Sequence, residues 1–201
     1  MSEQIFATKG NLLSSKKSLE LAQLGFDLMD KKRNILIREM MLLVDKASDI
    51  QSQIDETYAI AYKKLQRANV TLGVNPEIAS TIPVENGIEI DYRSVMGVEI
   101  PTVRLAESKL KMGYSLSDSN PMLDETERCF NEVKKLTAQL AEVENSVYRL
   151  AVAIKKAQKR ANALKNIVIP QLTDTIKFIT EALEEKERED LSRQKSIKRR
   201  L

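Results

Sequence analysis

The stretch CFNEVKKLTAQLAEVENSVYRLAVAIKKAQKRANALKNIV, residues 129–168, decides the fold. Its apolar residues recur in alternating steps of three and four, a spacing that places them on one stripe of an α-helix. The stripe contains no polar residue and consists of Cys129, Val133, Leu136, Leu140, Val143, Val147, Leu150, Ile154, Ala157, Ala161, Leu164 and Val168. A repeat this regular predicts one long coiled-coil helix.

The limits of this helix can also be read from the sequence. Asn120 and Pro121 suit an N-cap and a first helical residue, and the acidic Asp124 follows in the positive first turn. Beyond Val168 the apolar residues shift in phase to Leu172, Ile176, Ile179 and Leu183. Pro170 lies at this shift and removes a backbone donor, so we expect a kink or a local change of coiling there, and not a helix end.

A second stripe of the same kind runs through the N-terminal part of the chain. It consists of Leu19, Ala22, Phe26, Met29, Arg33, Leu36, Met40, Leu43, Ala47, Ile50, Ile54, Thr57, Ala61, Leu65, Ala68 and Leu72. Gly73, followed by Pro76, is a suitable stop because glycine readily takes the left-handed cap conformation. Since the two stripes match in length, we expect an antiparallel pair whose seam includes Phe26, Arg33, Leu36, Leu150, Ile154 and Leu164.

Two residues on the N-terminal stripe leave alternatives open. Arg33 either fixes the register of the pair from a core position or extends its charge to the edge of the seam. Gly25 either admits the close approach of another backbone or is merely tolerated in the helix. Cys129, the only cysteine, is expected to be a small buried core residue rather than a reactive thiol.

The middle of the chain has a different pattern. Segments 81–85 and 88–92 alternate apolar and polar residues around Asn86-Gly87, which is a strong signal for a two-residue hairpin turn. Val98–Leu105 can add a strand that Pro101 confines to a sheet edge. The predicted fold is therefore mainly α: an N-terminal helix within 1–72, a β-hairpin head within 73–118 and a C-terminal helix within 119–201.

Composition excludes several classes of function. The chain has 201 residues, 32 basic and 29 acidic side chains, a net charge of +3, and no histidine. That balance lacks the basic excess of a dedicated nucleic-acid binder. No phosphate-binding glycine-rich loop is present, and zinc sites and Cys-His nucleophilic pairs are excluded. We therefore expect no catalytic residue, no cofactor and no metal. We also expect no membrane-spanning segment, because a spanning helix needs about 20 apolar residues.

Two sets of residues resemble a known family. Near the N-terminus these are Thr8-Lys9, Leu12-Leu13, Leu19, Ala22, Gly25, Leu28, Asp30-Lys31-Lys32-Arg33 and Leu36. Near the C-terminus they are Arg160-Ala161-Asn162-Ala163-Leu164 and Ile167-Val168-Ile169-Pro170. Both sets are similar to the D subunit of the V-type and A-type rotary ATPases, although Phe26 stands where that family often has histidine.

The resemblance implies a central rotor shaft that transmits torque and does not cleave ATP. Its partners would be the hexamer of catalytic A and B subunits, the F subunit of the central stalk, and the socket subunit above the membrane ring, with the chain cytoplasmic and peripheral to the membrane. Basic residues near both chain ends would be candidates for contact with the hexamer: Lys9, Lys16, Lys17, Lys195, Lys198, Arg199 and Arg200. The main alternative is a prefoldin-like chaperone or another helical-hairpin adaptor, and a helical arm that binds RNA is a third possibility.

Overall fold

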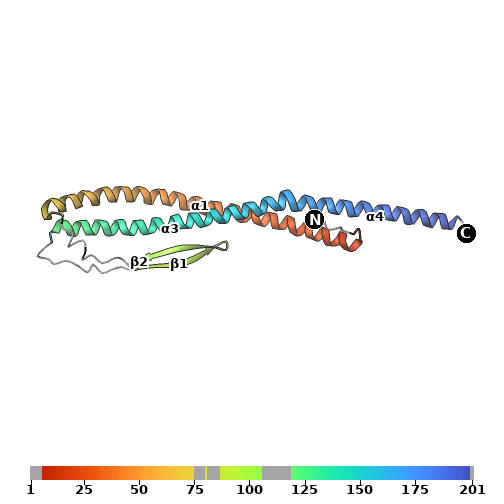
Figure 1. The fold of residues 1–201 in the computed structure, drawn as a ribbon, viewed down its shortest axis with the longest axis horizontal. Helices are drawn as coiled ribbons and strands as arrows, with labels where there is room; N and C mark the ends of the chain where they lie inside the picture. Colours follow the sequence, from red (N-terminus) through yellow and green to blue (C-terminus); the bar gives the residue numbers. More distant parts are fainter. Residues whose placement is uncertain (1–5, 75–79, 81–86, 106–118, 200–201) are drawn as a thin grey trace. The chain divides into compact units, whose positions relative to one another are not determined.

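The computed structural model describes residues 6–74, 80, 87–105 and 119–199. In chain order these residues form helix α1 (Lys9–Leu72), strands β1 (Ile88–Val95) and β2 (Val98–Leu105), helix α3 (Pro121–Ala163), π-helix η1 (Leu164–Val168) and helix α4 (Ile169–Lys198) (Figure 1). Long helical segments with one small antiparallel sheet between them are the mainly α fold that the sequence predicts.

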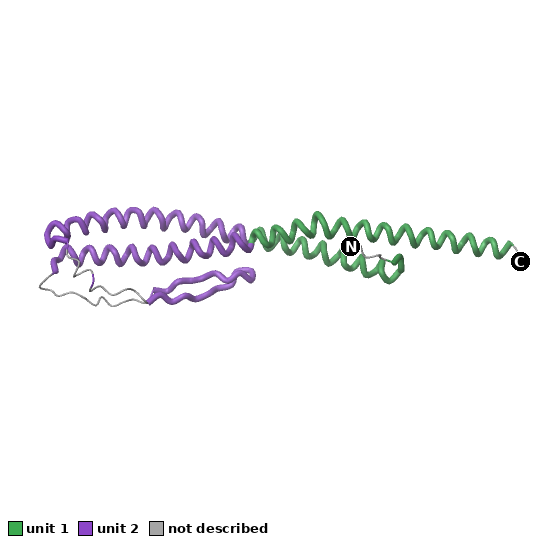
Figure 2. Tube along the Cα trace, in the orientation of Figure 1, with its two compact units in different colours: residues 1–35, 154–201 green, residues 36–153 purple. Residues whose placement is uncertain are grey.

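The chain divides into two compact units (Figure 2). Unit 1 contains residues 1–35 and 154–201, and unit 2 contains residues 36–153. Unit 1 joins the first part of α1 to the end of α3, η1 and α4, whereas unit 2 joins the rest of α1 to most of α3 and the hairpin. The predicted segments 1–72, 73–118 and 119–201 describe chain order and stay predictions as domains.

The helices run antiparallel in both units. In unit 1, Phe26 lies beside Lys165 and Lys9 lies beside Glu187, so residue numbers rise on α1 as they fall along the returning helix. In unit 2, the rings of Tyr62 and Phe130 meet edge to face at 5.7 Å between centroids. These pairs are far apart in sequence, and the fold therefore depends on the two helical segments finding one register.

The predicted stripes form the seams. Every buried apolar residue of the described helices belongs to one of the two stripes or to the phase-shifted run after Val168: Ala22, Leu36, Ile50, Ile54, Ala61, Ala68, Val133, Val143, Leu150, Ala157, Ala161 and Ile179. Burial of such side chains contributes about 1.5–3 kcal/mol for each large aliphatic residue. Cys129 is only half-buried, and a hydrogen bond with its thiol, assisted by the carboxylate of Glu125, raises the pKa of Lys64.

The helix ends follow local chemistry. Gly73 has a φ of +74°, and its amide donates to the Asn69 carbonyl at 2.9 Å, so it closes α1 in the left-handed conformation that the sequence predicts. At the start of α3, Pro121 is the first helical residue, as predicted. The carbonyl of Asn120 accepts the amide of Leu123 at 2.8 Å. Pro76 lies outside the described residues.

The hairpin turns at Met96-Gly97. Val95 pairs with Val98 and Ile88 pairs with Leu105, which leaves a two-residue loop whose φ values, 51° and 75°, are both positive. Such loops match the twist of the flanking strands. The sequence did not predict this turn because methionine seldom adopts a positive φ. The turn predicted at Asn86-Gly87 stays a prediction, since segment 81–86 lies outside the described residues.

Candidate functional site

A polar cluster interrupts the seam of unit 1 at Arg33. The guanidinium donates to the Gln158 amide oxygen at 2.8 Å and forms an ion pair with Asp30 at 2.7 Å. Asn34 accepts from the same guanidinium at 3.2 Å and donates to Asp30 at 3.2 Å. The Arg33 side chain is 25% exposed, so it neither lies fully in the core nor extends freely into solvent. Contact with Gln158 across the pair supports the first alternative, a side chain that fixes register.

The π-helix η1 lies next to this cluster in the chain. The Ile169 amide donates to the Leu164 carbonyl five residues earlier, and Pro170 follows within the first turn of α4. A π turn accommodates one residue more than an α turn. This extra residue matches the phase shift of the apolar stripe, in which Val168 is followed by Leu172 instead of residue 171. The change of coiling is thus present before Pro170, while a bend of the helix axis stays a prediction.

Gly25 and Phe26 face this π-helix from α1. A Cβ at Gly25 would lie 3.7 Å from the Leu164 Cδ1 atom, which is ordinary van der Waals contact. Among the described residues no backbone atom of another segment lies within 4 Å of that Cβ, so the structure favours tolerance of Gly25 over close approach of another backbone. The Lys165 ammonium lies 5.8 Å from the centre of the Phe26 ring, within the range of a cation–π contact.

Side chains of α3 fasten the hairpin in unit 2. The Val103 amide donates to the Glu142 carboxylate at 2.8 Å, and Arg149 donates to the Glu99 carbonyl at 3.2 Å. The Arg149 guanidinium also lies 5.3 Å from the centre of the Tyr92 ring. Backbone amides alternate sides along a strand, so the nitrogen of Pro101 lies on the same outer edge of β2 as the Val103 amide. The hydrogen that proline lacks is therefore not needed for a bond to β1.

The predicted basic residues near the chain ends lie at separate positions in unit 1. Lys9 begins α1 and pairs with Glu187 at 3.2 Å, beside a groove of about 330 Å³ between α1 and α4. Lys16 and Lys17 are exposed on α1. Lys195 and Lys198 are in the last turn of α4, and Arg199 follows as its cap. Lys195 is eight residues past Glu187, about 12 Å along the helix, and Arg200 lies outside the described residues.

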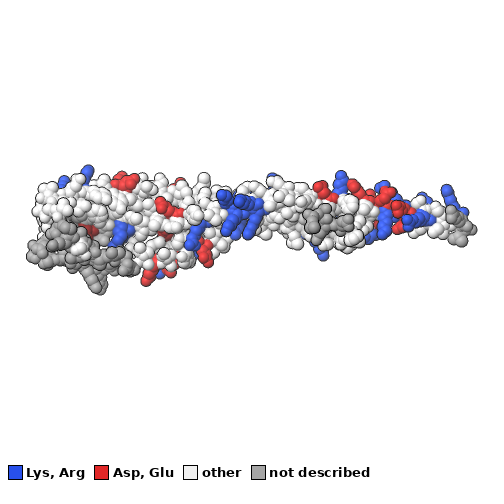
Figure 3. All heavy atoms as spheres, in the orientation of Figure 1, with Lys and Arg blue, Asp and Glu red and all other residues white. Residues whose placement is uncertain are grey.

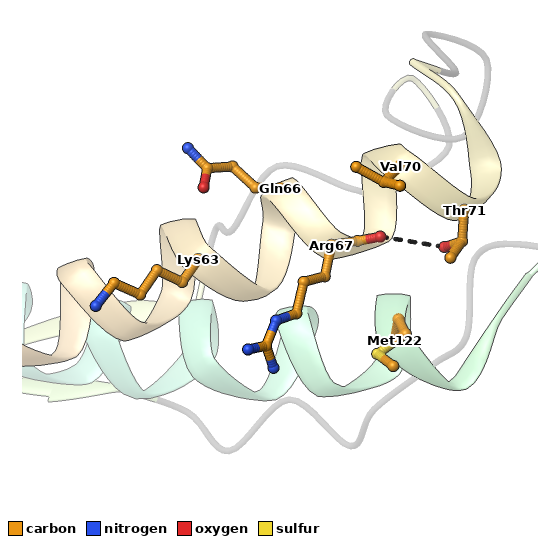
Figure 4. Close-up of a pocket in the computed structure, with 6 residues that line it drawn as sticks. All are labelled: Lys63, Gln66, Arg67, Val70, Thr71 and Met122. Carbon is orange, nitrogen blue, oxygen red and sulfur yellow. Dashed lines mark hydrogen bonds between the residues drawn. The ribbon is translucent and has the colours of Figure 1, made fainter.

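A second groove lies in unit 2, between the last turns of α1 and the start of α3 (Figure 4). It measures about 500 Å³ and is lined by Lys63, Gln66, Arg67, Val70, Thr71 and Met122. The Thr71 hydroxyl donates to backbone carbonyls, at 2.9 Å to Ala68 and 3.3 Å to Arg67. None of the lining residues is acidic, so this groove offers no pair of groups for acid–base chemistry.

Metal-binding clusters and membrane-spanning helices are both absent from the described residues. These residues contain no group of three or more histidine, cysteine, aspartate or glutamate side chains that can hold a metal ion. No helix in the described part of the chain is long and apolar enough to cross a membrane.

Comparison with known proteins identifies the family. The family model for the D subunit of ATP synthase matches residues 11–199. The chain belongs to the ATP synthase D-subunit family. The D subunit of a V-type ATP synthase from Thermotoga neapolitana is 41% identical over 196 residues, covering 96% of this chain and 97% of that protein.

A-type members of the D-subunit family are also similar to nearly the whole chain. The D subunit of the A-type ATP synthase of Pyrococcus horikoshii is 36% identical over 97% of this chain and 94% of that protein. That of Thermococcus sibiricus is 33% identical over 95% of this chain and 92% of that protein. The predicted resemblance to the D subunit is confirmed, and it extends through the middle segment, which the motifs did not cover.

Sequence reasoning missed several positions that this D-subunit fold uses. Ser146 and Thr126 are buried beside the seam, and each hydroxyl donates to the carbonyl four residues earlier, at 2.7 Å to Glu142 and 2.8 Å to Met122. Glu142 itself appears in the sequence as one of many surface carboxylates. No local signal distinguishes it, because its role depends on the position of the hairpin.

Proposed function

We propose that this chain is the central rotor shaft of a V-type or A-type ATP synthase. It transmits torque between the hexamer of A and B subunits, which hydrolyses or makes ATP, and the ion-translocating ring in the membrane. The chain itself does not cleave ATP and binds no cofactor. It is cytoplasmic and reaches the membrane only through the complex, where the F subunit of the central stalk and the socket subunit above the ring are its other partners.

One observation carries this proposal beyond the family match. In unit 1, α1 also has an exposed apolar stripe on the side away from its seam, at Leu21, Leu24 and Leu28. These side chains are 68%, 53% and 62% exposed, at the i, i+3, i+7 spacing of one helix face. Contiguous exposed apolar surface marks a protein interface. A shaft that turns inside a hexamer needs such a surface where the hexamer encloses it.

Regular seams support the mechanical part of the proposal. A torque-bearing element has to resist bending and twisting, and close-packed interiors transmit strain because they are poorly compressible. The polar cluster at Arg33 opposes sliding of one helix along the other, since any shift in register separates its guanidinium from Gln158. Eccentric regions of the shaft, including the segment around Pro170, would favour a different conformation in each catalytic interface as it turns.

The test is co-purification of a tagged chain from its native membranes, with the partners identified by mass. The proposal predicts that the A, B and F subunits and the socket subunit are recovered. In a variant carrying L21Q, L24Q and L28Q, recovery of the A and B subunits falls about tenfold, while the F subunit stays bound. The control carries V70Q and V74Q, which are also exposed, in unit 2. Recovery of only unfolded clients or further copies of the chain would overturn the proposal and favour a prefoldin-like chaperone.

A further inference from the structure

A patch of four cations occupies the end of α3 in unit 1. We call Lys155, Lys156, Lys159 and Arg160 the cationic patch, and all four side chains are exposed. The nearest acidic residues in the sequence are Glu144, eleven positions before the patch, and Asp174, fourteen positions after it. Figure 3 shows this concentration of positive charge as blue atoms gathered over the last part of α3.

The charge of the patch is not balanced within the described part of the chain. None of its four cations has a carboxylate within ion-pair distance among the described residues. The α1 segment that faces the patch, next to Gln158, contains Asp30, which already pairs with Arg33. Lys31 and Lys32 follow Asp30 and add further positive charge.

Helix α4 shows the opposite pattern. There, cations and carboxylates pair at i, i+4 spacing: Lys177 with Glu181, Arg188 with Glu184 and Arg193 with Glu189, at 4.0, 3.5 and 3.6 Å. In Figure 3 both colours alternate over this helix. Within the cationic patch, the i, i+4 pairs Lys155–Lys159 and Lys156–Arg160 are of like charge, an arrangement that destabilises a helix. A helix surface with unrelieved repulsion between cations is suited to binding a negatively charged partner outside the chain.

We propose that the cationic patch binds a carboxylate-rich segment of a neighbouring protein. Acidic protein fits better than nucleic acid, because no aromatic side chain that could stack on a base occurs between Tyr148 and Phe178. It also fits better than a lipid surface, because within one helical turn of the patch α3 exposes only one large apolar residue, Val152 at 38%, and no Trp, Phe or Leu that could insert beside the charges. This inference rests on the proposed function in one respect, namely that the neighbouring protein is a subunit of the hexamer that encloses the shaft.

The test compares two variants of the full chain that lose the same charge. The patch variant carries K155Q, K159Q and R160Q, and the control carries K46Q, K63Q and K135Q at exposed positions of unit 2. Circular dichroism verifies that both keep the native helix content, which glutamine supports. Binding is measured to the remainder of the complex, purified from its own membranes and stripped of this chain, at about 50 and 200 mM salt, a range over which exposed charges are increasingly screened.

The proposal predicts that the patch variant binds about tenfold more weakly at the lower salt, because three exposed ion pairs with the partner's carboxylates together contribute a modest free energy. The variant should also lose most of the salt dependence of binding. The control stays within about twofold of the native chain. Equal binding by the patch variant and the control would overturn the proposal. If the native chain did not bind the stripped complex at all, the proposed function would fail instead.

A second measurement tests the patch without the complex. The purified chain is titrated with poly-L-glutamate, with a 20-nucleotide RNA and with vesicles containing phosphatidylglycerol. The proposal predicts that poly-L-glutamate binds more tightly than the other two and that the patch variant weakens this binding severalfold. Tighter binding of the RNA or of the vesicles would overturn it, as would poly-L-glutamate binding that the patch variant leaves unchanged.

Discussion

At the scale of single residues, Arg33 and Gln158 make a polar contact that spans the helix pair in unit 1. The 2.8 Å bond joins a guanidinium to an amide, and bonds of this kind contribute about 1.5–3 kcal/mol when shielded and less when exposed. We expect a double-mutant cycle with R33M and Q158L, followed by urea unfolding, to give a coupling energy of about 1 kcal/mol. The same cycle with K31M in place of R33M is the control, and its coupling should be near zero. Equal coupling in both cycles would refute the register role of Arg33.

Gly25 provides a second prediction at this scale. Glycine inside a helix costs about 1 kcal/mol relative to alanine, and a Cβ here would only touch Leu164 at an ordinary distance. We therefore expect G25A to raise the free energy of unfolding by about 0.5–1 kcal/mol, which corresponds to about 1–4 °C in the unfolding midpoint. Gly10 has no neighbour within 4 Å and lies in the first turn of α1, where G10A should have a smaller effect. A loss of stability in G25A would mean that the helices need closer approach than this seam shows.

At the scale of elements, the hairpin depends on α3. The Val103 amide is protected by the Glu142 carboxylate, so E142A should expose it to solvent. We predict that hydrogen exchange at Val103 rises about 10–100-fold, the factor that a charged hydrogen bond of about 1.5–3 kcal/mol implies. The control is E144A, which removes an exposed carboxylate two residues away on the same helix. If both variants gave the same exchange rate, Glu142 would not hold the hairpin.

For the segment from η1 to Pro170, we predict that one substitution raises stability and lowers function. In P170A the backbone gains an amide donor inside a continuous helical segment, so the free energy of unfolding should rise by about 1–3 kcal/mol. The number of ions moved per ATP should fall, because a more regular helix removes the local change of coiling that our proposal uses. The control is Q171A, an exposed neighbouring position. Unchanged coupling in P170A would remove this segment from the mechanism.

At this scale the sequence predicted most of the fold. Helical stripes identify their own buried faces, and so Leu36, Ile50 and Leu150 were placed correctly from periodicity alone. The end of α1 at Gly73 and the start of α3 at Pro121 follow from local backbone preferences. The hairpin turn was not predicted because methionine seldom adopts a positive φ. The role of Glu142 was not predictable because it depends on a contact between segments that are distant in sequence. Likewise, Arg33 presented two alternatives until its partner across the pair was known.

At the scale of the whole molecule, the chain combines two kinds of surface. Its seams are mainly apolar and internal. The exposed apolar stripe at Leu21, Leu24 and Leu28 and the cationic patch, in contrast, are accessible to solvent in the described structure. Both open surfaces occur in unit 1. We therefore predict that unit 1 makes the contacts with the enclosing hexamer, in agreement with the candidate hexamer contacts near both chain ends that the family resemblance implies.

The measurement that tests the central claim most directly is rotation of this chain in its own complex. Cys129, the only cysteine, is replaced by serine, and S94C on the exposed face of β1 carries a gold bead while the hexamer is fixed to a surface. We predict that ATP drives the bead through full turns in one direction. A bead that stays still or only diffuses, in a complex that continues to hydrolyse ATP, would contradict the assignment of this chain as the rotor shaft.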